Sequence, residues 1–295
     1  MTAGARDDEG MILVNVLMFV AIAAGLVMLM IDREEVALDR ALRTREVARA
    51  EAVVRGGEVS ALVALRRDAA EAPDHDAASE PWGTLSENGA PIAGGTFDLA
   101  IADAEGRFNI NSLRSGQAAA TIMFETLASA MGIDRDTVLK AIEYIRLYGP
   151  VTDIRPLRAA GLTPEQQTAI EGLVTALPGE TAINLNAASE PMLAILFRDP
   201  VIAKRLVEIR TRNGALTLKD LSDQNVTMPF GTSFRSNTFW VRTRATIGDT
   251  VQQGATLIQR RSPESGGPIE VVPVERWWNA AVPPDAPSLP ARKSS

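Results

Sequence analysis

Few residues in this chain could carry chemistry. His75 is its only histidine, and it lies between Asp74 and Asp76 in a stretch rich in proline and glycine. A histidine beside carboxylates could bind a metal or act as a general base near neutral pH. Two neighbouring carboxylates without further ligands do not make a defined metal site, so the sequence favours an exposed loop histidine.

Acidic residues could support a second kind of chemistry, the binding of calcium. Calcium takes about six to eight oxygen ligands, and carboxylates are common among them. The candidate acids are Asp98, Asp103, Glu105, Asp153, Asp220 and Asp223. None of them belongs to a loop with the regular spacing of a known calcium site. Calcium is therefore a candidate cofactor whose ligands the sequence does not locate, and the metal content is unknown.

The usual catalytic patterns are missing from the sequence. The chain has no cysteine, which excludes disulfides, thiolate nucleophiles and Cys-ligated zinc. It also lacks G-x-S-x-G, a P-loop, G-x-G-x-x-G and H-E-x-x-H. We therefore expect that the protein is not an enzyme. An anchored periplasmic enzyme that works through carboxylates alone is the remaining catalytic alternative.

An apolar run near the N-terminus dominates the organisation of the chain. Residues 11–31 carry no charge and only one strongly polar side chain, Asn15. About 20 apolar residues in a helix are enough to cross the core of a bilayer. Residues 1–10 before the run are polar and end in Gly10, whereas a cleaved secretory signal has a shorter apolar core and a processing site after it. The run therefore predicts a single transmembrane helix.

The pattern after the apolar run predicts a rod, a sheet and a helical block. Residues 32–72 favour a continuing amphipathic helix, with a break at Gly56 and Gly57. Alternating residues 97–102 and 107–111, joined by an acidic glycine turn, predict a two-stranded hairpin. Residues 112–232 predict short capped helices, residues 233–278 predict three strands, and residues 279–295 predict a disordered tail.

The N-terminal arrangement resembles the class III leader of type IV pilins and type II secretion pseudopilins. In that family a prepilin peptidase cuts after a glycine and methylates the next residue, which implies Gly10 before the cut and Met11 after it. Residue five of the processed chain is then Asn15, where ordinary pilins have glutamate. The sequence is similar to the minor pseudopilin K family, which lacks this glutamate and has a pattern like the words IADAEGRFNINSL of residues 101–113.

The resemblance implies an α+β fold, with a long N-terminal helix, a pilin-like antiparallel sheet and a large all-α domain inserted between strands. The expected parts are a prepilin leader at 1–10, a transmembrane helix at 11–31, its continuation at 32–72, the first part of the sheet at 73–111, an inserted domain similar to SAM or helix-hairpin-helix modules at 112–232, the second part of the sheet at 233–278 and the tail at 279–295.

The resemblance also implies a structural role in protein transport. We expect a minor pseudopilin of a type II secretion system that caps or initiates the pseudopilus tip. The implied partners are minor pseudopilins of the I and J types, the major pseudopilin and the prepilin peptidase. The implied location is the inner membrane, crossed once, with most of the chain in the periplasm. The distribution of Lys and Arg points the other way, because one Arg precedes the span and Arg33, Arg40, Arg43, Arg45 and Arg49 follow it.

A second resemblance supports a different function, DNA binding by a membrane-anchored protein. Residues 183–223 resemble helix-hairpin-helix modules, whose hairpin glycines present backbone amides to phosphate. Here the hairpin contains Asp199 and Pro200, and the net charge of the chain is −7. Because an acidic protein repels nucleic acid, we expect no nucleic-acid partner, with helix-hairpin-helix DNA binding kept as the alternative function.

Overall fold

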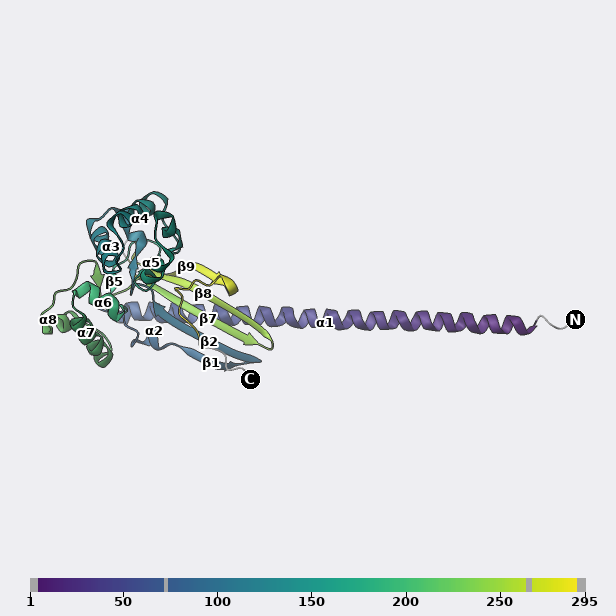
Figure 1. Cartoon of the computed structure of the whole chain (residues 1–295). Helices are drawn as coiled ribbons and strands as arrows, with labels where there is room; N and C mark the ends of the chain where they lie inside the picture. Colours follow the sequence, from purple (N-terminus) through teal and green to yellow (C-terminus); the bar gives the residue numbers. More distant parts are fainter. Residues whose placement is uncertain (1–4, 72–73, 264–266, 291–295) are drawn as a thin grey trace.

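The computed structural model describes residues 5–71, 74–263 and 267–290. A long helix projects from the rest of the chain, a sheet packs on the C-terminal part of that helix, and a group of short helices lies at the far end of the sheet (Figure 1). The start of α1 and the helical group are at opposite ends of the molecule. The predicted α+β fold class, with its long helix, antiparallel sheet and inserted helices, is confirmed.

Helix α1 runs without interruption over Ala5–Glu71, which is about 100 Å at 1.5 Å per residue. The predicted break at Gly56 and Gly57 is therefore wrong. The reason lies in packing, because a Cβ atom on Gly57 would be 2.6 Å from Cζ of Phe97 and 2.9 Å from Cγ2 of Thr243. The missing side chain lets the helix approach the sheet closely, and this contact compensates for the low helix propensity of glycine.

The two glycines should respond to alanine in opposite directions. Gly57→Ala forces Phe97 and Thr243 to move, and we expect it to lower the free energy of unfolding by about 1–2 kcal/mol. A Cβ atom on Gly56 meets nothing within 4 Å, so Gly56→Ala should raise that free energy by about 0.5–1 kcal/mol. Urea unfolding of the two variants tests this, and equal effects would contradict the packing argument.

Five antiparallel strands form the sheet, in the order β1-β2-β7-β8-β9. Their bounds are Glu87–Ile92, Gly95–Asp103, Thr238–Ile247, Thr250–Arg261 and Glu270–Trp278. The face toward α1 is apolar, because alternate residues of a strand point to the same side. Its core contains Ala61, Leu65, Trp82, Leu99, Ile101, Phe239, Val241, Ile258 and Val271, with Trp82 supplied by the short helix α2 over Pro81–Thr84.

The hairpin predicted from residues 97–102 and 107–111 is wrong. Strand β2 pairs with β1 and β7 instead, and the two-residue strand β3, Phe108–Asn109, pairs in parallel with β4, Val174–Thr175. Phe108 and Ile110 are buried in the core of the helical group rather than in the sheet. The chain thus leaves the sheet after β2, makes the whole helical group, and returns at β7.

The helical group has one apolar core of its own, which includes Phe124, Ile145 and Leu206. Its α-helices are α3 at Ala118–Ala130, α4 at Arg135–Tyr148, α5 at Pro164–Glu171, α6 at Glu190–Phe197, α7 at Pro200–Asn213 and α8 at Leu218–Asp223. Short 3-10 helices cover Ile110–Ser115 and Arg155–Ala160, and strands β5, Ile183–Asn184, and β6, Thr232–Ser233, pair in parallel.

Buried asparagines hold the entrance to this group. Asn109 donates to Gly179 O and accepts from Leu177 N, at 2.9 and 3.0 Å. Asn111 donates to the carbonyl oxygens of Val151 and Leu177 and accepts from Val151 N. An amide side chain can donate and accept at once, so each asparagine satisfies backbone groups that the irregular loops leave unpaired. This gives a physical reason for the N-x-N spacing in residues 109–111.

The tail predicted as disordered over residues 279–295 is ordered as far as residue 290. After the 3-10 helix Asn279–Ala281, Asp285 accepts hydrogen bonds from Arg107 and Thr175, both at 2.8 Å. Pro290 O accepts from Arg244. These contacts fix the segment against the face of the sheet opposite α1. Residues 291–295 lie outside the described part of the chain.

Candidate functional site

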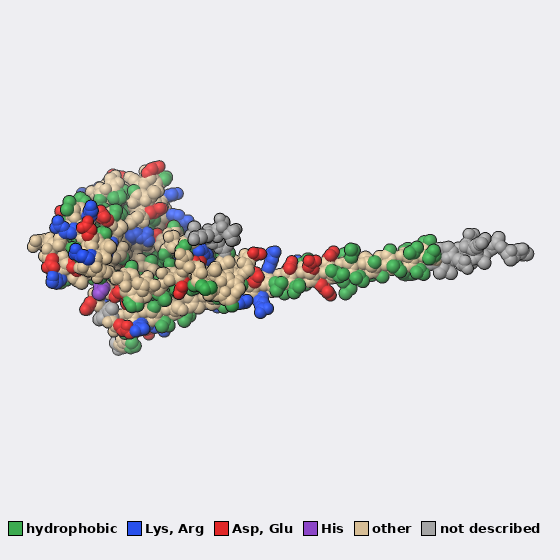
Figure 2. All heavy atoms as spheres, turned by 90° about the horizontal axis from the view of Figure 1, so that it is seen from below, with side chains coloured by type: hydrophobic (Ala, Val, Ile, Leu, Met, Phe, Trp, Pro, Cys, Tyr) green, Lys and Arg blue, Asp and Glu red, His purple; other side chains and the backbone are tan. Residues whose placement is uncertain are grey.

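The apolar N-terminal part of α1 forms the first candidate site. Among the described residues, α1 is the one helix that is long and apolar enough to cross a membrane. Its large side chains between Leu13 and Ile31 are 51–72% exposed. Figure 2 shows these hydrophobic side chains along the projecting rod, followed by charged ones nearer the body. This arrangement fits a single-pass membrane anchor.

The predicted processing site lies within this helix. Gly10 and Met11 are both helical in α1, but their side chains are not among those described. Asn15 lies one turn further along and is exposed. Cleavage after Gly10, methylation of Met11 and the special role of Asn15 therefore stay predictions.

A second surface of α1 lies between the anchor and the sheet. Val36, Leu38 and Leu42 are 49%, 60% and 48% exposed, and the first fully buried residue of α1 is Ala50. Polar contacts then fasten the helix to the sheet, because Glu46 accepts from Thr250 and Glu58 accepts from Arg276. The segment before Ala50 thus presents apolar side chains that the described part of the chain does not cover.

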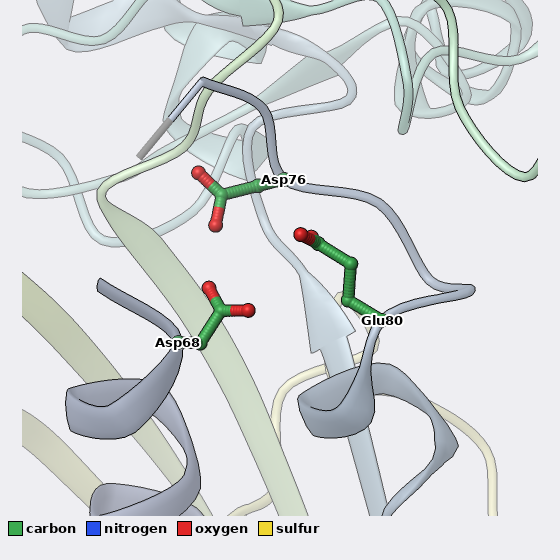
Figure 3. Close-up of side chains that lie close together, drawn as sticks. All are labelled: Asp68, Asp76 and Glu80. Carbon is green, nitrogen blue, oxygen red and sulfur yellow. The ribbon is translucent and has the colours of Figure 1, made fainter. Parts of the chain in front are cut away.

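A cluster of buried charges lies where α1 ends. Asp68, Asp76 and Glu80 point toward one another from the end of α1 and from the loop that follows it (Figure 3). Arg260 from β8 reaches into the cluster, with its Nη2 2.6 Å from Asp68 Oδ2 and its Nη1 bonded to Asp76. Its guanidinium also lies 4.6 Å from the centre of the Phe239 ring. We call these four charged residues the carboxylate junction.

The carboxylate junction ties together parts of the chain that are far apart in sequence. Asp76 accepts from the backbone N of Ser236 at 2.8 Å, and Glu80 accepts from Ala77 N and Trp82 Nε1 at 2.7 and 3.2 Å. Burial raises the pKa of Asp68 to about 6, although the hydrogen bond from Arg260 acts in the opposite direction. The carboxylate oxygens lie close enough to ligate a metal, but Arg260 already supplies the positive charge.

His75 belongs to the edge of the junction and not to a free loop. Its Nε2 lies 3.8 Å from Glu80 Oε1, and its side chain is 33% exposed. Of its two acidic neighbours, Asp76 is buried and paired, whereas Asp74 is exposed. His75 is therefore less exposed than the sequence predicts.

Two further acids, the half-buried Asp103 and the buried Glu105, adjoin the junction. Asp103 accepts from Asn184 Nδ2 and Ser236 Oγ, both at 2.7 Å, and from the backbone N of Glu105. Burial raises the pKa of Asp103 to about 6. Burial likewise raises the pKa of Glu105 to about 8, and its Oε1 has no hydrogen-bond partner among the described residues. Glu105 is therefore expected to hold a proton at neutral pH.

The six acids considered for calcium do not form one cluster. Asp98 pairs with Arg244, Asp153 with Arg155, and Asp223 with Lys219. Asp220 caps α8 through Thr217 N. Of the six, only Asp103 and Glu105 are in contact among the described residues, through the hydrogen bond from Glu105 N to Asp103. Calcium binding stays a prediction without an assigned set of ligands.

The hairpin between α6 and α7 is unsuited to phosphate. Asp199 accepts hydrogen bonds from the backbone N atoms of Val201 and Ile202, at 2.8 and 3.2 Å. These are the amides that a helix-hairpin-helix module would offer to DNA, and a carboxylate already occupies them. Arg210 of α7 does not face solvent as a phosphate contact would, because it donates to the carbonyl oxygens of Leu185, Asn186 and Ala188.

The sequence patterns did not single out Asp68, Glu80 and Arg260 as site residues. A signal for Arg260 was available, because Thr256, Ile258 and Arg260 alternate along β8 and all three are buried. Asp68 likewise continues the buried positions Ala61 and Leu65 of α1. A charged residue at a position where the repeat of a strand or helix places apolar side chains indicates a buried ion pair.

Comparison with known proteins shows a likeness in sequence and a likeness in fold. No family model matches the chain. Its sequence is 25% identical over 302 residues to type II secretion system protein K of Pseudomonas aeruginosa, covering 86% of this chain and 90% of that protein. Its fold matches a chain of the crystal structure of the GspK–GspI–GspJ complex from the type II secretion system of enterotoxigenic Escherichia coli, with a TM-score of 0.59 and 18% identity, covering 81% of this chain and 99% of that chain.

The resemblance to the pseudopilin K family seen in the sequence is thus confirmed. Both likenesses extend over most of the chain and over nearly the whole of each relative. The relatives are named as components of a secretion system, and neither name describes an enzyme.

Proposed function

We propose that this protein is a minor pseudopilin K of a type II secretion system, which caps or initiates the pseudopilus tip together with minor pseudopilins of the I and J types. One observation carries the proposal: the helical group is inserted between β2 and β7, two neighbouring strands of a sheet built on a continuous 67-residue helix. The likeness to protein K and to a chain of the GspK–GspI–GspJ complex supports the same role.

The position of the helical group favours the tip over the shaft. Pseudopilin subunits assemble with their N-terminal helices side by side, so the opposite end of each subunit faces along the filament. In this chain that end carries the whole helical group (Figure 1). A subunit stacked above it would collide with this group, whereas a subunit at the tip has none above it.

Asn15 suits the same position. The resemblance to pilins implies that the glutamate of an ordinary subunit pairs with the N-terminal amine of the subunit ahead in the filament. A tip subunit has no subunit ahead of it, so a glutamate at position 15 would have no amine to pair with. An unpaired charge inside the membrane is unfavourable, and a neutral asparagine avoids that cost.

Helix α1 carries both the segment proposed to span the membrane and the surface proposed to contact partners. We propose that a prepilin peptidase removes residues 1–10 and that residues 11–31 hold the chain in the inner membrane, with most of it in the periplasm. The distribution of Lys and Arg opposes this orientation. The exposed Val36, Leu38 and Leu42 would pack on the helices of the other minor pseudopilins, with the major pseudopilin below them.

The mass of the mature protein tests the pathway. We expect protein extracted from membranes of cells with a prepilin peptidase to begin at methylated Met11. In cells without the peptidase it should begin at Met1, and Gly10→Val should remain unprocessed even when the peptidase is present. A chain that begins at Met1 in all three samples would contradict the proposal, as would a cut beyond Ile31.

The number of copies per filament tests the tip position separately. We expect labelled protein at one end of each pseudopilus and complexes with the I and J pseudopilins after mild extraction. Many copies along the shaft would contradict a capping role even if the N-terminus were processed as expected.

A further inference from the structure

A cleft lies between the helical group and the outer face of the sheet, which is the face opposite α1. Its volume is about 330 Å³. The sheet contributes Trp240, Leu257, Glu275 and Trp277, the helical group contributes residues around Arg155 and Glu171, and the C-terminal segment closes one side with Pro283, Pro284 and Asp285. Clefts between parts of a protein are common binding sites.

Two tryptophans form the floor of this cleft. The ring centres of Trp240 and Trp277 are 5.2 Å apart, with an angle of 45° between the rings. Trp240 is only 4% exposed, and its Nε1 has no hydrogen-bond partner among the described residues. The cleft therefore exposes little of Trp240, and the half-buried Trp277 offers the more accessible ring.

The charges in the cleft leave an excess of carboxylates. Arg107 is paired with Asp285 at 2.8 Å, and Arg155 is paired with Asp153 at 2.5 Å. Glu275 forms no ion pair or hydrogen bond with another described residue, and burial raises its pKa. It lies next to the floor, because Trp240 pairs with Leu257 and Leu257 pairs with Glu275 across three adjacent strands. Glu171 adds a second, exposed carboxylate at the rim.

We propose that this cleft binds an arginine side chain presented by an extended segment of a partner protein. The guanidinium would stack on Trp277 and pair with Glu275, which lacks a cation of its own. The cleft repels anions through its carboxylates, and a neutral ligand would leave Glu275 uncompensated. Arginine fits better than lysine because its planar group both stacks and forms forked hydrogen bonds.

The charge of the ligand provides a direct test on the full-length protein in detergent micelles. The probe is the capped tripeptide acetyl-Gly-Arg-Gly-amide, and its control is the same peptide with citrulline, which has nearly the shape of arginine but no charge. We expect calorimetric titration to show about tenfold tighter binding of the arginine peptide, which is the scale of a partly desolvated cation–π contact plus an ion pair.

Variants locate the binding to the cleft. Glu275→Gln keeps the shape of the side chain and should reduce the preference for arginine over citrulline to about twofold or less. Trp277→Leu should weaken binding of the arginine peptide by about tenfold. Glu270→Gln removes the same charge from the same strand outside the cleft and should leave binding unchanged. Thermal unfolding confirms that each variant is folded. Equal binding of the two peptides, no binding of either, or binding unaffected by Glu275→Gln would overturn the proposal.

Discussion

Replacing Arg260 with methionine should destabilise the protein more than any other single exchange described above. Arg260 is 5% exposed and supplies the cation between Asp68 and Asp76, which are themselves buried. Removing it leaves both carboxylates without a compensating positive charge, and breaking a buried pair in this way costs about 3–5 kcal/mol. Urea unfolding in detergent micelles, followed by tryptophan fluorescence, measures the loss.

Two controls separate the charge from the volume of the side chain. Arg261→Met changes the next residue of β8, which is exposed and donates only to Gln259 among the described residues, and should change stability by less than about 0.5 kcal/mol. Adding Asp68→Asn to Arg260→Met removes one of the unpaired charges and should recover part of the loss. If Arg260→Met alone cost under about 1 kcal/mol, the carboxylate junction would not be an important source of stability.

The sequence predicts the elements of this fold better than their partners. The uninterrupted apolar run of residues 11–31 and the alternation in residues 238–247 are local signals, and both elements are found. Pairing is not local: β2 finds its neighbour β7 about 140 residues further along the chain. The period of a strand shows which side chains share a face and says nothing about which strand lies beside it. The hairpin error has this cause.

Glycine has two uses that the sequence does not distinguish. Gly57 looks like a helix break because its propensity is low, but in the structure it marks a close approach of α1 to Phe97 and Thr243 of the sheet. Gly106 behaves similarly, because a Cβ atom there would lie 2.5 Å from Ala187 O. Both glycines are required by tertiary contacts, which no local rule can anticipate.

The candidate site was only partly accessible from the sequence. The anchor with Asn15 is a composition signal and was identified directly. The carboxylate junction needs four residues from α1, the following loop and β8, so its members become neighbours only after folding. The resemblance to a family supplied the function, because nothing in the separate positions of these charges indicates it.

The stability of the protein should fall as the pH rises from 5 to 8. Burial raises the pKa of Glu105 in the folded state from its ordinary 4.5 to about 8. A carboxyl group with a raised pKa contributes stability that is fully present below its unfolded pKa and is lost as the pH rises through its folded pKa. Between these values the folded state binds one more proton, so Glu105 alone lowers the unfolding free energy by about 1.4 kcal/mol per pH unit.

Glu105→Gln isolates this contribution from that of its neighbours. Glutamine resembles the protonated acid, so the variant should be about as stable as the native chain near pH 5 and more stable near pH 8. The slope of stability against pH should become shallower by about 1.4 kcal/mol per pH unit between pH 5 and 7.5. In this variant the unfolding free energy should still fall with pH near the acidic end of the range, with a smaller slope, because the pKa values of Asp68 and Asp103 are also raised, to about 6. Glu270→Gln, on the exposed start of β9, should leave the native slope in place, and a slope that survives Glu105→Gln would mean that Glu105 is ionised in the folded protein.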